Sequence, residues 1–268
     1  MNILVIGAGS IGTKVIQESE NIDKIDTCYV YDHHEKEARQ TTDTVDGAEF
    51  TGNFDDIIDD VDLVVEAASQ EAVKEFGKIV LESGKDLMIM SVGALADDKL
   101  REELFNTAEE EASNIYLPTG ALCGLDGIES ASIVDVDEVT LETKKSPNSL
   151  RESKFVKEND IDVDSYEEKE VLFEGKAKEA VKHFPKNVNV AAALSLAGIG
   201  FERTTVKIIL DPHTDRNSHT IKLKGEAGDL MGRSLNLPFP DNPRTSYLAA
   251  LSAVSALKKI CGNVWSGM

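Results

Sequence analysis

Cysteines and long apolar runs are both scarce in this sequence of 268 residues, and each shortage excludes a class of protein. The three cysteines, Cys28, Cys123 and Cys261, lie far apart and form no CxxC motif, which argues against a disulfide framework or a zinc site. No stretch approaches the roughly 20 apolar residues of a membrane-spanning helix. The first residues carry no basic region or cleavage site of a signal peptide, so we expect a cytoplasmic protein without a membrane segment.

Basic residues are also scarce. The chain has 28 Lys and Arg against 49 Asp and Glu, which gives a formal net charge of -21. Such a surface repels nucleic-acid phosphates and anionic membranes, and the longest basic clusters are pairs such as Lys144-Lys145, so we expect no nucleic-acid partner. The histidines form no HxH or HxxxH cluster and the carboxylates are scattered, so we also expect no metal site.

Short apolar runs alternate with helical patterns in the first third of the chain. Short apolar strands separated by helices predict an α/β fold, with a parallel sheet that helices cover on both faces. One such helix has apolar residues from Ala72 to Val80 and ends at Gly84. The predicted strands are Ile3 to Ile6, Thr27 to Tyr31, Val61 to Ala67, Leu87 to Met90 and Asn114 to Leu117.

The pattern changes after about Leu122. Val139 to Lys145 alternates apolar and polar residues, as a half-exposed antiparallel strand does. Residues 147–170 are polar and acidic, and we interpret them as a loop with at most a short helix. The remaining predictions are strands at Val171 to Glu174, Thr205 to Asp211 and His219 to Lys224, and helices at Ala177 to His183, Asn189 to Ile199 and Ser246 to Ile260.

A GxGxxG motif at residues 7–12 follows the first strand and opens a helix. That context favours a dinucleotide-binding loop over a glycine-rich turn without a ligand. Gly7 permits the tight turn, Gly9 lets the backbone approach a pyrophosphate, and Gly12 lets the helix pack on the sheet. The cofactor-binding residues expected here are Gly7, Gly9, Ser10, Ile11 and Gly12.

Asp32 ends the second strand, about 20 residues beyond the last glycine of this motif. A carboxylate there binds the ribose hydroxyls of NAD and repels the 2′-phosphate of NADP, unless it only caps a loop. His33 and His34 follow it and are able to meet a phosphate, so NADP stays open as a cofactor. Ala68, at the end of a later strand, leaves room for the cofactor at the same edge of the sheet.

Polar groups in the second half of the chain are candidates for the chemistry. His219 lies in the segment DPHTDRNSHTI, which we interpret as the connection between two strands, and such connections are often solvated hairpins. Asn187 and Asn189 precede a small-residue helix and either cap it or contact a nicotinamide. The glycines around Ala121 let backbone amides face a ligand.

Five motifs, GAGSIG, TGALCGLDGI, FPKNVNVAAALSLAG, DPHTDRNSHTI and NPRTSYLA, occur in this order. Together they resemble the L-aspartate dehydrogenases, relatives in fold of homoserine dehydrogenase and dihydrodipicolinate reductase. The resemblance covers nearly the whole chain and is weakest at residues 147–170. It implies a Rossmann domain at residues 1–121, a mixed α+β catalytic domain at 122–240, and a final helix at 241–268 that returns to the first domain.

The resemblance also implies roles for single residues. His219 matches the active-site histidine of the family, Ala121 a backbone contact to NAD, and Asn189, with Asn187 second, another NAD contact. The reaction implied is the oxidation of L-aspartate by NAD or NADP to iminoaspartate, which hydrolyses to oxaloacetate and ammonia or feeds NAD biosynthesis. A base near neutral pKa suits this reaction, as His219 would be.

Two acidic groups on the substrate call for local cations in so acidic a protein. Arg216 and Lys186 are the candidates we favour, with Asn217 beside them and Lys222 as a weaker cation. The family commonly forms a homodimer, and an exposed sheet face in the second domain would suit one. The rival interpretations are another oxidoreductase of the homoserine dehydrogenase type and a catalytically inactive NAD-binding sensor.

Overall fold

The computed structural model describes residues 1–184, 188–240 and 242–267. The chain divides into two compact units. The first joins Met1–Pro118 to Ala250–Ser266, and the second is built mainly from Thr119–Ala249. In the part of the chain that is described, no helix has the length and apolar character needed to cross a membrane.

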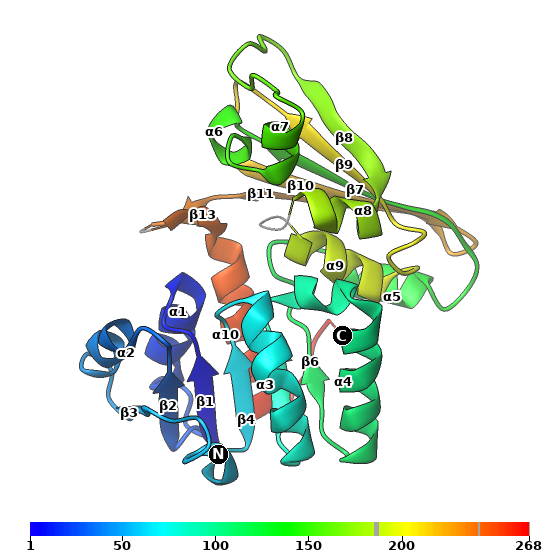
Figure 1. Cartoon of the computed structure of the whole chain (residues 1–268). Helices are drawn as coiled ribbons and strands as arrows, with labels where there is room; N and C mark the ends of the chain where they lie inside the picture. The colour runs from blue at the N-terminus through cyan, green and yellow to red at the C-terminus, as the bar shows by residue number, and fades with distance from the viewer. Residues whose placement is uncertain (185–187, 241, 268) are drawn as a thin grey trace. The chain divides into compact units, whose positions relative to one another are not determined.

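A six-stranded parallel sheet forms the centre of the first unit (Figure 1). Its strands are β1 (Asn2–Ile6), β2 (Thr27–Tyr31), β3 (Ala48–Phe50), β4 (Leu63–Glu66), β5 (Asp86–Ile89) and β6 (Ile115–Tyr116). Their order is β3-β2-β1-β4-β5-β6, and β1 pairs in parallel with both β2 and β4. The order therefore reverses at β1, and doubly wound sheets bind ligands at the carboxyl ends of the strands beside such a reversal.

Helices cover this sheet because its strands are apolar on both faces. The helix α3 begins where the Ser69 hydroxyl accepts a hydrogen bond from the backbone N–H of Ala72, and the chain leaves it through Gly84 at φ 67°. The helices of this unit are α1 (Ser10–Ser19), α2 (Glu35–Thr42), α3 (Gln70–Glu82) and α4 (Asp98–Glu110), the 3-10 turns η1 (Ile58–Asp60) and η2 (Val92–Ala96), and most of α10 (Tyr247–Cys261).

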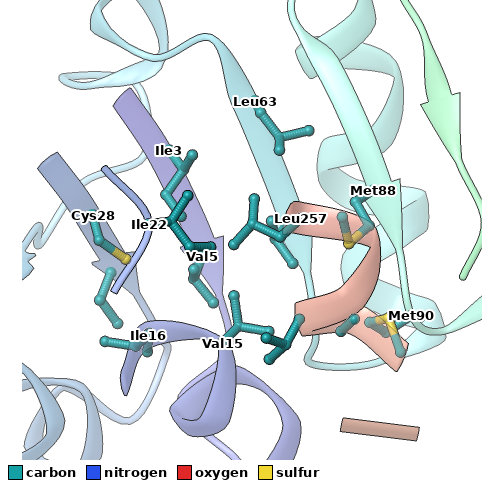
Figure 2. Packing of buried hydrophobic residues seen from close by; sticks show 14 of the residues in the cluster. Ile3, Val5, Val15, Ile16, Ile22, Cys28, Leu63, Met88, Met90 and Leu257 are labelled. Carbon is teal, nitrogen blue, oxygen red and sulfur yellow. The ribbon is translucent and has the colours of Figure 1, made fainter. Parts of the chain in front are cut away.

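The last helix, α10, is part of the core of the first unit. Ala253 and Leu257 on α10 are fully buried in the same cluster as Val5 and Met88. Figure 2 shows the Leu257 side chain among the buried side chains of this cluster, with Val5 and Met88. The core of the amino-terminal unit is therefore completed by residues close to the other end of the chain, and these contacts are long-range in sequence.

A five-stranded mixed sheet, in the order β11-β10-β7-β9-β8, is the framework of the second unit. β10 runs antiparallel to both β7 and β11, while β7 runs parallel to β9. Its strands are β7 (Val136–Lys145), β8 (Glu170–Lys176), β9 (Thr205–Leu210), β10 (Asn217–Gly225) and β11 (Gly228–Asn236), and a separate pair is formed by β12 (Pro238–Phe239) and β13 (Asn242–Ser246).

The two faces of this sheet differ because side chains alternate along each strand. One face buries Val139, Leu141 and Ile221, whereas the other presents charged groups such as Glu142 and Lys222. The end of α9 packs on the buried face, where a Cβ at Gly198 would lie 3.7 Å from Val139. The helices of the second unit are α5 (Leu125–Ala131), α6 (Pro147–Leu150), α7 (Lys154–Glu158), α8 (Ala177–His183) and α9 (Val188–Ala197).

The fold class and the strands expected from apolar runs are confirmed. The sequence patterns did not reveal β3 or β11, because β3 has three residues and β11 is largely exposed. The segment after Leu210 joins β9 to β10 as expected, but the two strands do not form a hairpin, since β7 lies between them in the sheet. The predicted strand His219 to Lys224 is confirmed as β10, which begins two residues earlier at Asn217, so that His219 lies inside the strand.

Candidate active site

The glycine loop between β1 and α1 has the shape that a dinucleotide requires. Gly7 has φ 103°, and a Cβ on it would lie 2.8 Å from the Cβ of Ala68. A Cβ on Gly12 would clash with the carbonyl oxygen of Gly7, so α1 packs closely against the loop. A Cβ on Gly9 would meet nothing within 4 Å. The space above Gly9 therefore fits a pyrophosphate, next to the N-terminus of α1, which has no side-chain cap.

Asp32 connects the end of β2 to this loop. One carboxylate oxygen accepts a 2.7 Å hydrogen bond from the backbone N–H of Ala8, and the other accepts one of 2.7 Å from the backbone N–H of His34. Each carboxylate oxygen has a second acceptor position, so these bonds leave Asp32 able to accept a ribose hydroxyl. These two hydrogen bonds hold the carboxylate beside the glycine loop.

Glu66, at the end of β4, was not singled out from the sequence. It is buried, and Oε1 accepts hydrogen bonds of 2.9 Å from the N–H groups of Ala68 and Ser69 and from the Ser91 hydroxyl. Oε2 accepts one of 2.9 Å from the N–H of Ser91. Burial raises the pKa of Glu66, while these bonds oppose the shift. Glu66 thus fixes two adjacent strand ends at the edge where the cofactor is expected.

His219 is only 5% exposed and lies on the buried face of the second sheet. It is directly opposite Thr143 on β7, and the Thr143 Oγ1 lies 3.0 Å from the His219 Nδ1. Burial and, as the smaller cause, the positive charge of Lys145 together lower the pKa of His219 to about 3. The imidazole is therefore neutral at physiological pH and held by one ring nitrogen, and its pKa in the free protein lies well below the near-neutral value expected from the sequence.

Lys145 lies two residues beyond Thr143 on β7, and alternation places both side chains on the same face. It is 7% exposed, and burial lowers the pKa of its ammonium to about 8. The group remains mostly charged at pH 7. A buried cation thus accompanies the buried imidazole.

The backbone carbonyl of Ala121 is hydrogen-bonded to side chains of β11. The carbonyl oxygen of Ala121 accepts hydrogen bonds from the Ser234 hydroxyl at 2.8 Å and from the Asn236 amide at 2.9 Å. Ser234 is directly opposite His219 in the β10–β11 pairing. Ser234 therefore connects Ala121, an expected cofactor contact, to the strand position opposite His219.

The other expected substrate and cofactor residues are less enclosed. Arg216 is 49% exposed and lies 3.7 Å from the Asp215 carboxylate, immediately before Asn217, the first residue of β10. Lys222 lies on the opposite face of the sheet from His219 and pairs with Glu142 at 2.6 Å. Asn189 is exposed in the first turn of α9. Lys186 and Asn187 lie outside the described residues.

No group of three or more His, Cys, Asp or Glu side chains that could hold a metal ion occurs within residues 1–184, 188–240 and 242–267. The residues missed in the sequence are polar side chains on strands. On β7 and β11 they occupy positions where the alternation points inward, and on β4 the missed residue ends a run of buried apolar residues. The missed residues are Glu66, Thr143, Lys145, Ser234 and Asn236.

Comparisons with known proteins find relatives of both units. Residues 126–260 match the family described as aspartate dehydrogenase, C-terminal, and residues 7–118 match the NAD binding domain of homoserine dehydrogenase. The L-aspartate dehydrogenase of Methanosarcina barkeri is 45% identical over 269 residues, covering 100% of this chain and 99% of that protein. The chain belongs to the L-aspartate dehydrogenase family.

Other L-aspartate dehydrogenases are also similar to this chain over nearly its whole length. The L-aspartate dehydrogenase of Methanococcoides burtonii is 47% identical over 97% of each chain. The crystal structure of aspartate dehydrogenase from Thermotoga maritima is 31% identical and has a TM-score of 0.79. The match covers 100% of this chain and 99% of that chain. A homoserine dehydrogenase from Thiobacillus denitrificans, 13% identical with a TM-score of 0.61 over 97% of this chain and 73% of its own, shares the fold.

Proposed function

We propose that this protein oxidises L-aspartate with NAD to iminoaspartate, which hydrolyses to oxaloacetate and ammonia. The observation that carries the proposal is the neutral, buried His219, held through Nδ1 by Thr143 with the ammonium of Lys145 nearby. A buried titratable group with a shifted pKa and a charged neighbour is typical of a catalytic site. Its position in the family's histidine motif supports the assignment.

His219 is the general base of the proposed mechanism. When bound, the nicotinamide ring supplies the hydride acceptor for the hydrogen on substrate C2. The substrate amine must lose a proton for the imine to form, and a neutral imidazole is able to take it. That role requires Nδ1–H to donate to the Thr143 Oγ1, so that Nε2 carries a free lone pair. The same nitrogen is suited to orient the water that hydrolyses the imine.

NAD is the cofactor we propose, since the fixed charge of Asp32 would repel a 2′-phosphate. The loop residues Gly7, Gly9, Ser10, Ile11 and Gly12 would hold the pyrophosphate, and the Glu66 hydrogen bonds would keep Ala68 in place beside it. Ala121, Asn189 and Asn187 are proposed as further contacts to NAD.

Arg216, Asn217 and Lys186 are proposed as groups that meet the substrate. In the direction of synthesis, the product iminoaspartate would feed NAD biosynthesis. We also propose a homodimer formed through the open face of the second sheet, where Met231 and Leu235 are exposed among charged side chains. Size-exclusion chromatography with light scattering tests this, and a monomer at micromolar concentration would refute it.

Absorbance at 340 nm tests the function directly. Wild-type protein receives L-aspartate, L-glutamate or L-homoserine with NAD or NADP, and NADH should form with aspartate alone. Turnover of homoserine instead would move the assignment to that class of dehydrogenase. The variant His219→Asn separates an enzyme from a sensor: we expect turnover to fall at least about 100-fold with unchanged NADH binding, because general-base catalysis is lost.

A further inference from the structure

Lys145 is distinguished from the other lysines of its sheet by burial and by its face. Its neighbour Lys144 points to the opposite, charged face, where lysines pair with glutamates, as Lys207 does with Glu174 at 2.9 Å. Lys145 instead lies on the apolar face, 7% exposed, on the side of Thr143 and His219. The Lys144-Lys145 pair of the sequence is therefore split between two environments.

Placing an ammonium on this face is electrostatically unfavourable for folding. A buried cation loses its hydration, and here it also lies near a group that becomes cationic when it binds a proton. The ammonium of Lys145 and the imidazole of His219 together disfavour additional positive charge on this face, and such a place suits an anionic ligand.

We propose that Lys145 binds a carboxylate of the substrate beside His219 and thereby determines the selectivity for a dicarboxylic amino acid. This inference rests on the proposed function, because it takes aspartate as the molecule in the site. The net charge of -21 repels such a substrate from most of the surface, so one desolvated cation has a large effect. Arg216, at 49% exposure, is far better screened by water.

Carboxylate binding at Lys145 has a consequence for the base. In the free protein the charge of Lys145 helps to keep the pKa of His219 low, so the imidazole is a weak base. A bound carboxylate offsets that charge and increases the proton affinity of His219 while the substrate amine is in place. Substrate binding and activation of the base are then coupled through one side chain.

The test compares Lys145→Met with the matched control Lys144→Met, which removes the same charge from the adjacent residue on the other face. Methionine fills a similar volume, and apolar replacements of buried charges usually fold well. Calorimetry measures succinate binding to the NADH-loaded protein, and the assay at 340 nm measures kcat and KM for aspartate. We expect Lys145→Met to weaken succinate binding and to raise KM by about 10- to 150-fold, the range for a hydrogen bond to a charged group. Lys144→Met should stay within about twofold.

The outcomes separate this inference from the proposed function. The affinity for NADH should stay unchanged in both variants, which excludes general misfolding. Equal succinate affinity in Lys145→Met and Lys144→Met, or no succinate binding by wild type, would overturn the role of Lys145. Absence of aspartate turnover in wild type, with Lys145-dependent succinate binding intact, would instead overturn the proposed function. Competition by β-alanine and by L-alanine, each with one of the two carboxylates, identifies which one Lys145 binds.

Discussion

Thr143→Val removes one hydroxyl from a fully buried position and tests how His219 is held. The hydroxyl oxygen lies 3.0 Å from the Nδ1 of His219, and valine keeps the shape without an acceptor. The Nδ1–H group is then buried without that hydrogen bond, at a cost of about 1 to 3 kcal/mol. If the intact bond is needed when the base accepts a proton, kcat should fall by about 5- to 150-fold, at roughly 1.4 kcal/mol per factor of ten.

The control is Thr140→Val, three residues earlier on β7. Thr140 is also buried, but its hydroxyl donates to Glu138 at 2.8 Å on the other face of the sheet. Steady-state rates at 340 nm over a range of aspartate concentrations give kcat and KM separately, and thermal melts check folding. Thr143→Ser, which keeps the hydroxyl, should retain most of kcat. Equal rates in Thr143→Val and Thr140→Val would refute the assignment of Thr143 as the residue that positions the base.

Three further predictions concern the core, the pH dependence and the cofactor. Leu257→Ala should lower the free energy of unfolding of the first unit by about 3 to 4 kcal/mol, because it removes three buried carbons and leaves a cavity. Urea titration measures this loss. The control Leu251→Ala, at a residue 38% exposed on the same helix, should lower the free energy of unfolding by less than about 1 kcal/mol. The pKa of His219 is about 3 in the folded protein and about 6.5 in the unfolded chain, so between these values the unfolded chain binds one more proton. The free energy of unfolding should therefore fall as pH drops from 6.5 towards 3. The slope should be at most about 1.4 kcal/mol per pH unit, and His219→Gln should lack this one-proton contribution. Asp32→Asn should raise the ratio of kcat/KM for NADP to that for NAD by about tenfold, and an unchanged ratio would contradict the electrostatic argument for NAD.

The first unit was largely predictable because its signals are local in the sequence. The glycine motif, the strand before it and Asp32 all occur within about 30 residues, and each has a direct physical reason. The second unit was harder because its candidate site depends on strand pairing. Thr143 and His219 are 76 residues apart, and only the register of β7 against β10 brings them together. Lys145 looked like half of a surface basic pair until alternation placed it on the buried face.

The position of α10 in the core of the first unit has a consequence for how the chain folds during synthesis. The strands from β1 to β6 leave the ribosome first, but the apolar layer that includes Val5 and Met88 is closed only by Ala253 and Leu257. The nascent amino-terminal half therefore exposes part of its core while the whole second unit is translated. We expect the second unit, which is built mainly from one uninterrupted segment, to be the first to reach a protease-resistant state on the ribosome.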